Sequence, residues 1–237
     1  MTTNRIVRTP SHPWSGLLRL MLTLLVTACA VTPLHADDRD DAGLVRTANL
    51  IYGENKTSVC FSDEFLVQIQ RDTFIRTERR FSSVKLESGE LFEFPFAVMS
   101  GEGSFTLSDV QRDNLNSYLT GGGFIVASAG CSSEKWNESI RNEIATIFPD
   151  RELTTLDADH PVFQMVYDVR EVEYRNGDKK LPELEGLEID GKVVLILSID
   201  GLNDTANAGP NCCCCGGNEI RNAADVNVNL LSYALLY

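Results

Sequence analysis

The chain has 237 residues and carries 34 acidic against 21 basic side chains, so its formal net charge at pH 7 is −13. A chain this acidic repels phosphate backbones, which argues against nucleic acid as a partner, and it is a poor match for anionic lipid headgroups. The length suits one domain with a full hydrophobic core.

The N-terminal residues have the pattern of a secretory signal peptide. Arg5 and Arg8 form a basic start, an apolar run follows at 16–26, and Ala36 precedes an acidic leader at 37–43. The apolar run is short for a helix that spans a bilayer. We therefore expect cleavage after residue 36 and export to the periplasm or the medium.

A second cleavage position is open. The stretch "VTAC" resembles a lipobox, in which Cys29 becomes the lipidated first residue of a membrane-anchored chain. Contact with a membrane would then come only from the signal segment or from the lipid on Cys29. Removal of residues 1–36 leaves 18 basic against 34 acidic residues, a net charge of −16.

Apolar runs and turn residues predict alternating strands and helices in the rest of the chain. The expected strands are 44–53, 82–88, 94–101, 124–128, 152–156, and two at 186–199 around a turn at Asp190-Gly191; the expected helices are one from Ser62 or Asp63, one between Thr106 and Gly121, 134–148, and an amphipathic one at 223–237. For the second helix, Thr106 with Asp109 is the expected N-cap pair and Gly121 the expected C′ residue.

Strands that alternate with helices predict an α/β fold with a mostly parallel sheet covered on both faces. In such sheets, binding sites form in the loops after the carboxyl ends of the strands. We therefore expect the residues 101–104, Cys131 and the loop 203–219 to share one functional edge.

Several stretches resemble the DUF4159 family in order and spacing. They are "LVRTANLIYG", "FPFAVMSGEGSFTLSDVQRDNLNSYLTGGGFIVASAGC", "DADHPVF", "LEGLEIDGKVVLILS" and "AADVNVNLLSYALLY", which together cover most of 44–237. The resemblance implies a single domain over 44–237. It also implies a flavodoxin-like three-layer sandwich, similar to class I glutamine amidotransferases, and it implies no established activity.

The resemblance places Cys131 in the turn between strand and helix where those amidotransferases carry their nucleophilic cysteine. A helix N-terminus there would stabilise a thiolate. The same pattern needs a histidine and a glutamate late in the chain, but no histidine follows His160. The leading hypothesis is therefore a binding or assembly module of the cell envelope without the usual triad, with other envelope proteins as its partners.

A thiol-dependent hydrolase or transferase is the first alternative. A cysteine needs a base or a positive neighbour to act as a nucleophile at neutral pH. His160 is the only histidine that remains after removal of the signal peptide, so Cys131 and His160 are the candidate catalytic pair. Pro161 favours an extended backbone at His160.

A metal or redox protein is the second alternative. Cys212, Cys213, Cys214 and Cys215 are consecutive, and Glu219 follows after two glycines. Thiolates favour metals such as zinc, although the usual C-x-x-C spacing is absent. Disulfides are the structural alternative, because Cys60, Cys131 and the quartet make an even number of cysteines in an exported chain.

Overall fold

The structure, a computed structural model, describes residues 43–54, 61–203 and 220–237. The strands are β1 (Thr47–Ile51), β2 (Ser82–Lys85), β3 (Phe96–Gly101), β4 (Phe124–Ala129), β5 (Leu153–Thr155), β6 (Val172–Glu173), β7 (Lys179–Lys180), β8 (Leu184–Ile189) and β9 (Lys192–Ser198). The α-helices are α2 (Glu64–Asp72), α3 (Asp109–Thr120), α4 (Glu134–Ile147) and α5 (Ala223–Leu236), and the 3-10 helices are η1 (Gly89–Glu93), η2 (Gly130–Ser132) and η3 (Pro161–Gln164). The expected signal peptide, including Cys29, lies outside the described residues.

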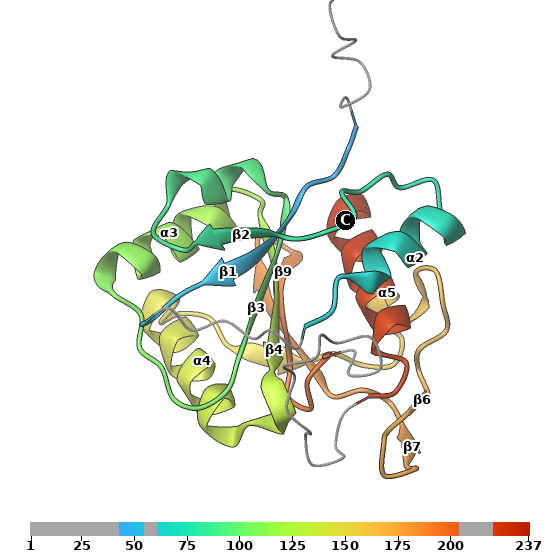
Figure 1. The fold of residues 1–237 in the computed structure, drawn as a ribbon. Helices are drawn as coiled ribbons and strands as arrows, with labels where there is room; N and C mark the ends of the chain where they lie inside the picture. Colours follow the sequence, from blue (N-terminus) through green and yellow to red (C-terminus); the bar gives the residue numbers. More distant parts are fainter. Residues whose placement is uncertain (1–42, 55–60, 204–219) are drawn as a thin grey trace, which may run out of the picture. The chain divides into compact units, whose positions relative to one another are not determined.

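The described residues form one seven-stranded sheet with the order β2-β1-β3-β4-β9-β8-β5, and β6 and β7 pair separately (Figure 1). The first five strands run parallel, whereas β8 and β5 are antiparallel to their neighbours. The parallel part has the 2-1-3-4-5 order of flavodoxin-like folds. The predicted α/β class and mostly parallel sheet are confirmed.

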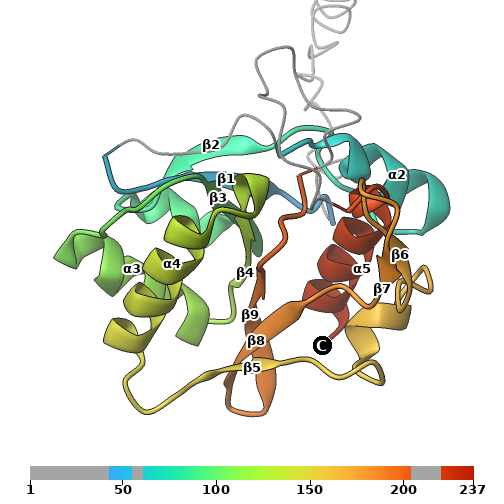
Figure 2. The same ribbon diagram turned by 90° about the horizontal axis from the view of Figure 1, so that it is seen from below.

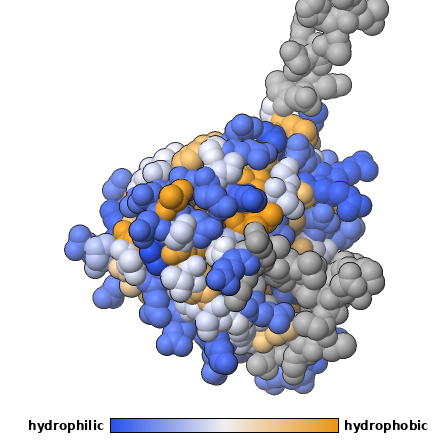
Figure 3. Space-filling view, turned by 60° about the vertical axis from the view of Figure 1, so that its left-hand side comes forward, coloured by the Kyte–Doolittle hydropathy of each residue, from blue (hydrophilic) through white to orange (hydrophobic). Residues whose placement is uncertain are grey.

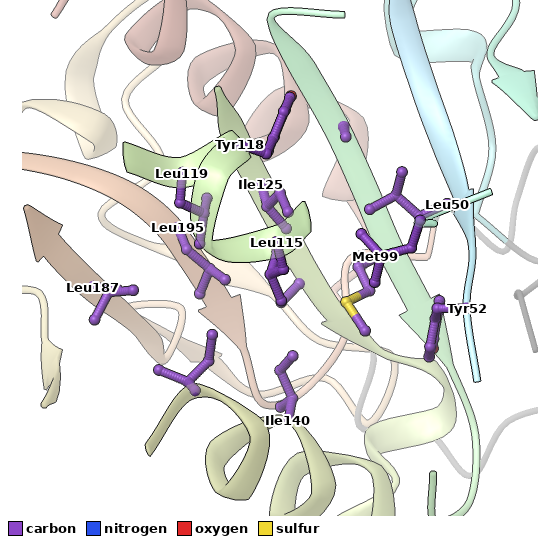
Figure 4. Close-up of a cluster of buried hydrophobic side chains, with 14 of the residues drawn as sticks. Leu50, Tyr52, Met99, Leu115, Tyr118, Leu119, Ile125, Ile140, Leu187 and Leu195 are labelled. Atoms are coloured by element: carbon purple, nitrogen blue, oxygen red, sulfur yellow. The ribbon is translucent and has the colours of Figure 1, made fainter. Parts of the chain in front are cut away.

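The helices cover both faces of the sheet. Figure 2 shows α3 and α4 on one side and α2 and α5 on the other. The α3–α4 side buries side chains such as Leu50, Met99 and Leu115 (Figure 4). Every residue of β3 and β4 is buried, which is why both read in the sequence as continuous apolar runs.

The hairpin between β8 and β9 follows the predicted turn chemistry. Asp190 has a φ of 52° and Gly191 a φ of 79°, as a type I′ turn requires. The two strands pair directly on either side of this turn, which makes β8 the first antiparallel member of the sheet.

The predicted caps of α3 were wrong in position. The N-cap is Ser108, whose hydroxyl accepts from Gln111 N while the Gln111 side chain accepts from the N-cap backbone, a reciprocal capping box. At the other end Gly121 has an ordinary φ of −83°, and the left-handed residue is Gly122 with a φ of 96°. The Ser108–Gln111 pair satisfies the backbone N–H groups of both Ser108 and Gln111 at the start of the helix.

The closing helix is buried nearly all round instead of being amphipathic. Residues 226–233 are all buried, including three polar side chains. Asn229 shows how a polar side chain is accommodated there: its Oδ1 accepts from the backbone N–H groups of Val166 and Tyr167, and its Nδ2 donates to the carbonyls of Val162 and Tyr167. Its hydrogen-bonding capacity is filled, so its burial costs little.

Hydrophilic residues predominate on one face of the described molecule. Figure 3 shows this face, on which apolar patches are scattered among the hydrophilic residues. No helix within residues 43–54, 61–203 and 220–237 has the length and apolar character needed to cross a membrane.

Candidate functional site

Three turns meet at the carboxyl end of the sheet, after β3, β4 and β9. Gly101 lies opposite Ala129, and Ser128 lies opposite Ser198, so the three strands end at the same level. The expected edge is therefore present as far as the structure describes it, through Asn203. The rest of the predicted loop, 204–219, lies outside the described residues.

Side-chain hydrogen bonds tie these turns together. Ser133 Oγ accepts from Gly103 N at 3.2 Å, which joins the turn after β3 to the start of α4. Ser132 Oγ donates to the Asp200 carbonyl at 2.8 Å, which joins the turn after β4 to the turn after β9. The edge is therefore a connected unit, in which displacement of one turn disturbs its neighbours.

Two glycines allow the close approach of these turns. A Cβ on Gly201 would lie 2.2 Å from the Ala129 carbonyl oxygen, and the φ of Gly201 is +89°. A Cβ on Gly101 would lie 2.4 Å from the Tyr52 hydroxyl oxygen and 2.9 Å from Trp136 Nε1. Both positions require glycine because no side chain fits and, at Gly201, because the backbone conformation is left-handed.

Cys131 sits in a strained turn between β4 and α4. Its φ and ψ are 54° and 33°, and the next residue, Ser132, also has a positive φ of 52°. Left-handed conformations cost a non-glycine residue about 1 kcal/mol each, so the surrounding hydrogen bonds must hold this turn. Cys131 is partly exposed in this turn, and the turn lies between β4 and α4, where the family resemblance places it.

Cys131 is disulfide-bonded, and its partner cysteine lies outside the described residues. Its Sγ lies 3.3 Å from Glu102 Oε1. A disulfide sulfur carries no proton, so this contact becomes a hydrogen bond only after reduction. The adjacent carboxylate would then oppose formation of a thiolate, against the helix N-terminus that favours it.

A row of serines lies beneath the edge, on the face that α2 and α5 cover. Ser100, Ser128 and Ser198 are register partners on β3, β4 and β9, and all three are buried. Ser128 Oγ accepts from Leu202 N at 2.8 Å, whereas Ser198 Oγ has no hydrogen-bond partner among the residues that the structure describes. The parallel strands thus end in a polar layer instead of an apolar one.

Two asparagines complete this polar layer. Ser100 Oγ donates to Asn203 Oδ1 at 3.5 Å, and Asn227 Nδ2 of α5 donates to the Leu202 carbonyl at 3.2 Å. Asn203 Nδ2 and Asn227 Oδ1 are buried, and neither has a hydrogen-bond partner within residues 43–54, 61–203 and 220–237. An unpaired donor and an unpaired acceptor of this kind are suited to ordered water.

Asp200 is the acidic residue of the turn after β9. Tyr174 donates to its Oδ2 at 2.9 Å, and Lys180 Nζ lies 3.8 Å from the same oxygen. Burial raises the pKa of Asp200 above its usual value, and the hydrogen bond from Tyr174 and the charge of Lys180 oppose that rise. Tyr174 directly follows β6 and Lys180 belongs to β7, so the small β6–β7 sheet holds Asp200 in one orientation.

A crevice lies where the strand order reverses, between β1 and β3. It has a volume of about 450 Å³ and is lined by Gly53, Glu54, Glu87, Thr106, Ser108, Val110 and Gln111. A second depression of about 260 Å³ continues it along Glu54 and residues 104–106. In open α/β sheets this reversal point, at the carboxyl ends of the strands, is where ligands bind.

A family model described as "Domain of unknown function (DUF4159)" matches residues 46–235. This chain belongs to the DUF4159 family. The match spans all the described strands and helices of the DUF4159 domain except the last residue of α5. A comparison with curated proteins found no match.

The DUF4159 domain does not bring Cys131 and His160 together. His160 packs against Tyr233 with ring centroids 5.2 Å apart, and Tyr233 packs against Phe124 at the start of β4. Cys131 follows the other end of that strand, and five residue steps of a strand span roughly 16 Å. The two residues therefore lie at opposite ends of the sheet, far beyond hydrogen-bond reach.

His160 has a structural role in the DUF4159 domain. Its Nδ1 accepts from Val162 N at 3.3 Å, so the side chain caps η3, and its backbone is extended, as Pro161 predicts. Burial lowers the pKa of His160, which keeps the ring neutral and able to accept this hydrogen bond.

The candidate metal ligands Cys212, Cys213, Cys214, Cys215 and Glu219 lie outside the described residues, as does Cys60. Within the described part of the DUF4159 domain, no three His, Cys, Asp or Glu side chains are grouped so that they could hold a metal ion. The zinc hypothesis for the cysteine quartet therefore stays a prediction.

The sequence reasoning missed the serine row and the crevice. One signal was present for the serines, since each apolar run of β3, β4 and β9 carries a serine at or next to its end. Glu54 and Glu87 follow different strands and are 33 residues apart. Nothing in their local patterns indicates that they line one crevice.

Proposed function

We propose that this chain is an exported binding module of the cell envelope, which holds a ligand rich in hydroxyl or ammonium groups in the crevice between β1 and β3. The observation that carries the proposal is the chemistry of the crevice lining. It contains two carboxylates, two hydroxyls and one amide, and no lysine or arginine is among the described lining residues.

This lining favours hydrogen-bond donors over anions. Glu54 and Glu87 supply carboxylate acceptors, and Gln111 donates to Glu87 at 2.9 Å, which lowers the pKa of Glu87 and keeps it ionised. Hydrogen bonds between donors and an ionised carboxylate are stronger than neutral ones. A ligand with several hydroxyl or ammonium groups can use both carboxylates together.

Phosphate is a poor ligand for the same crevice, although flavodoxin-like folds can bind it at this point. The N-terminus of α3 is closed by its own capping box, in which Ser108 Oγ accepts from Gln111 N. Gly53 N donates to Gln111 Oε1 at 3.3 Å, so this backbone donor is also engaged. The two nearby carboxylates would repel a phosphate further.

Two observations support a function without hydrolysis by a triad. A sulfur in a disulfide is not a nucleophilic thiolate, and Cys131 is disulfide-bonded. His160, the remaining candidate base, lies at the opposite end of the sheet and caps η3. We therefore place the thiol-dependent hydrolase hypothesis below the binding hypothesis.

The test is binding of a short glucosamine oligosaccharide, which carries both hydroxyl and ammonium groups, followed by amide chemical shifts. We expect shifts at Gly53, Thr106 and Gln111, and no shifts there with inorganic phosphate or AMP. The double variant Glu54→Gln with Glu87→Gln should weaken binding by about tenfold or more.

The matched control is Glu188→Gln, which removes an exposed carboxylate of β8 and should leave the affinity unchanged. Binding of phosphate at the crevice would contradict the proposal. So would an oligosaccharide that binds equally well to the double variant, or one that does not bind at all.

A redox function is the second candidate, because the strained, partly exposed Cys131 is disulfide-bonded. Strained or exposed disulfides are the more easily reduced ones. Thiol counting with and without reductant, under native and denaturing conditions, tests this candidate. Rapid reduction under native conditions would support it, and a disulfide that resists reduction until unfolding would identify a structural cross-link. Metal analysis of the reduced protein tests the zinc alternative.

A further inference from the structure

One exposed surface combines an aromatic ring with several arginines. We name it the arginine–phenylalanine face, and it comprises Val67, Arg71, Phe74, Arg76, Arg79 and Arg80. Phe74 is fully exposed and Val67 is 40% exposed. The ten residues 71–80 contain four of the 21 basic residues of this acidic chain and two acids, a local net charge of +2.

Hydrogen bonds hold Phe74 in its exposed position. The preceding residue, Thr73, donates through both N and Oγ1 to the Ile69 carbonyl, and the following residue, Ile75, donates through its N–H to Thr73 Oγ1. Single exposed apolar residues are common on protein surfaces. Here, however, the turn on both sides of Phe74 is fixed, so the ring is presented to solvent by an ordered backbone.

The two adjacent arginines, Arg79 and Arg80, are presented by a segment that is also anchored. Thr77 Oγ1 donates to the Leu66 carbonyl of α2, and the Phe81 ring packs 5.8 Å from that of Phe65. Arg79 and Arg80 are exposed between these two attachments. The arginine–phenylalanine face is therefore an ordered surface, formed by the C-terminal half of α2 and the segment that follows it.

This face lies beside the point where the described chain begins. Val45 N donates to the Arg76 carbonyl at 2.8 Å, and Glu78 N donates to the Val45 carbonyl at 3.0 Å. In Figure 1 the segment after α2 and the start of β1 lie at the same end of the sheet. Gly43 lies 14 positions after Cys29, a reach of at most about 50 Å when the chain is fully extended.

We propose that the arginine–phenylalanine face docks the folded domain onto an anionic phospholipid bilayer. Phe74 would enter the interface between headgroups and acyl chains, and Arg79 and Arg80 would contact lipid phosphates. Arg71 is already paired with Asp72 through two hydrogen bonds, so it adds little to this contact. The net charge of −13 does not prevent this, because charges farther from the bilayer than the Debye length of about 10 Å are largely screened. The proposal does not depend on the proposed ligand in the crevice.

The bilayer fits this face better than a protein partner does. The aromatic ring stands out from the surface among cations, and the adjacent chain start leads toward the expected signal segment or lipid at Cys29. The carboxyl edge with Cys131 and the crevice, at the opposite end of the sheet, would then face away from the membrane. Ligand binding at that edge would remain possible in the docked state.

The test places a fluorescent reporter on the face in the full chain. Phe74→Trp is compared with Val110→Trp. Val110 is 57% exposed and lies in the first turn of α3, where it lines the crevice. Both proteins keep the same leader and the same native tryptophans, so differences report the substituted position. Vesicles of equal parts phosphatidylcholine and brominated phosphatidylglycerol serve as the quenching membrane, and brominated phosphatidylcholine alone serves as the neutral one.

We expect quenching and a blue shift for Phe74→Trp on the anionic vesicles, and neither for Val110→Trp. Adding Arg79→Ser and Arg80→Ser should weaken this vesicle binding by about tenfold or more, and high salt should act in the same direction. Equal quenching at both positions, equal binding to neutral vesicles, or no quenching at all would overturn the proposal. Circular dichroism confirms that each variant is folded.

Discussion

The indole Nε1 of Trp136 donates a 2.6 Å hydrogen bond to the hydroxyl of Tyr52, which in turn donates to the Ser100 carbonyl at 3.0 Å. All of this lies in the buried core below Gly101. The contact joins the end of β1, the end of β3 and the first turn of α4. These hydrogen bonds therefore fix how the end of β1 is positioned relative to the end of β3, and these two strands border the crevice.

Tyr52→Phe should destabilise the domain by about 2 kcal/mol, because it removes the acceptor of the buried Trp136 N–H and the hydroxyl that donates to the Ser100 carbonyl. Urea unfolding measures this change. Tyr237→Phe, which removes the hydroxyl of an exposed tyrosine, is the control and should change stability by no more than about 0.5 kcal/mol. Equal effects of the two substitutions would show that the buried hydrogen bonds contribute little.

Gly201→Ala should cost far more than Gly191→Ala, although both glycines have positive φ values of 89° and 79°. A Cβ on Gly191 meets nothing within 4 Å, so only backbone strain of about 1 kcal/mol applies there. A Cβ on Gly201 would overlap the Ala129 carbonyl, and this overlap should add at least about 2 kcal/mol. Thermal unfolding of both variants gives the difference, and similar midpoints would contradict the close approach of the turns.

His160 should make the domain less stable as the pH falls below about 6.5. Burial lowers its pKa in the folded state, so the unfolded chain binds the proton more tightly than the native state does. The stability that neutral His160 contributes is fully present above the pKa of the unfolded state. This stability is lost as the pH falls from that pKa toward the lower pKa of the folded state. His160→Asn keeps a capping acceptor for Val162 N without titrating there. The stability difference between wild type and this variant, measured at about pH 7.5 and pH 5, should favour the variant more at the lower pH, and a constant difference would be inconsistent with the lowered pKa.

Asp200 should have the opposite dependence. Its folded-state pKa is raised by burial, so the native state holds the proton more tightly and stability falls as the pH rises through that raised value. Asp200→Asn keeps an oxygen that accepts from Tyr174 and removes the partly buried charge. The variant should be as stable as wild type or more so at neutral pH, by up to about 1 kcal/mol, with the gain disappearing near pH 4. Asp113→Asn, an exposed position on α3, should show no such trend.

The elements that periodicity predicted well are those with dense apolar patterns or explicit turn residues. β3 and β4 are buried on both faces, and the β8–β9 hairpin carries its Asp-Gly turn, so local sequence was sufficient there. The helix α5 was misjudged because its buried asparagines resemble a polar face. Only the tertiary hydrogen bonds of Asn229 show that this polar side chain can be buried at little cost.

The candidate site was less predictable than the fold. The edge that carries Cys131 follows from strand direction alone, and the sequence predicted it. The separation of Cys131 and His160 depends on the path of the chain after β5, where β-rich and helical patterns are weak. The crevice carboxylates come from separate strands, so only the order of the strands, with β1 between β2 and β3, brings Glu54 and Glu87 to one place.

The strands at the two margins of the described sheet are also its shortest, since β2 has four residues and β5 has three. Every other strand of that sheet has five or more. Unpaired backbone groups at a sheet margin are templates on which another chain can add a strand, and short margins with exposed polar side chains such as Lys85 offer few of them. Copies of this domain at high concentration should therefore resist joining into continuous sheets.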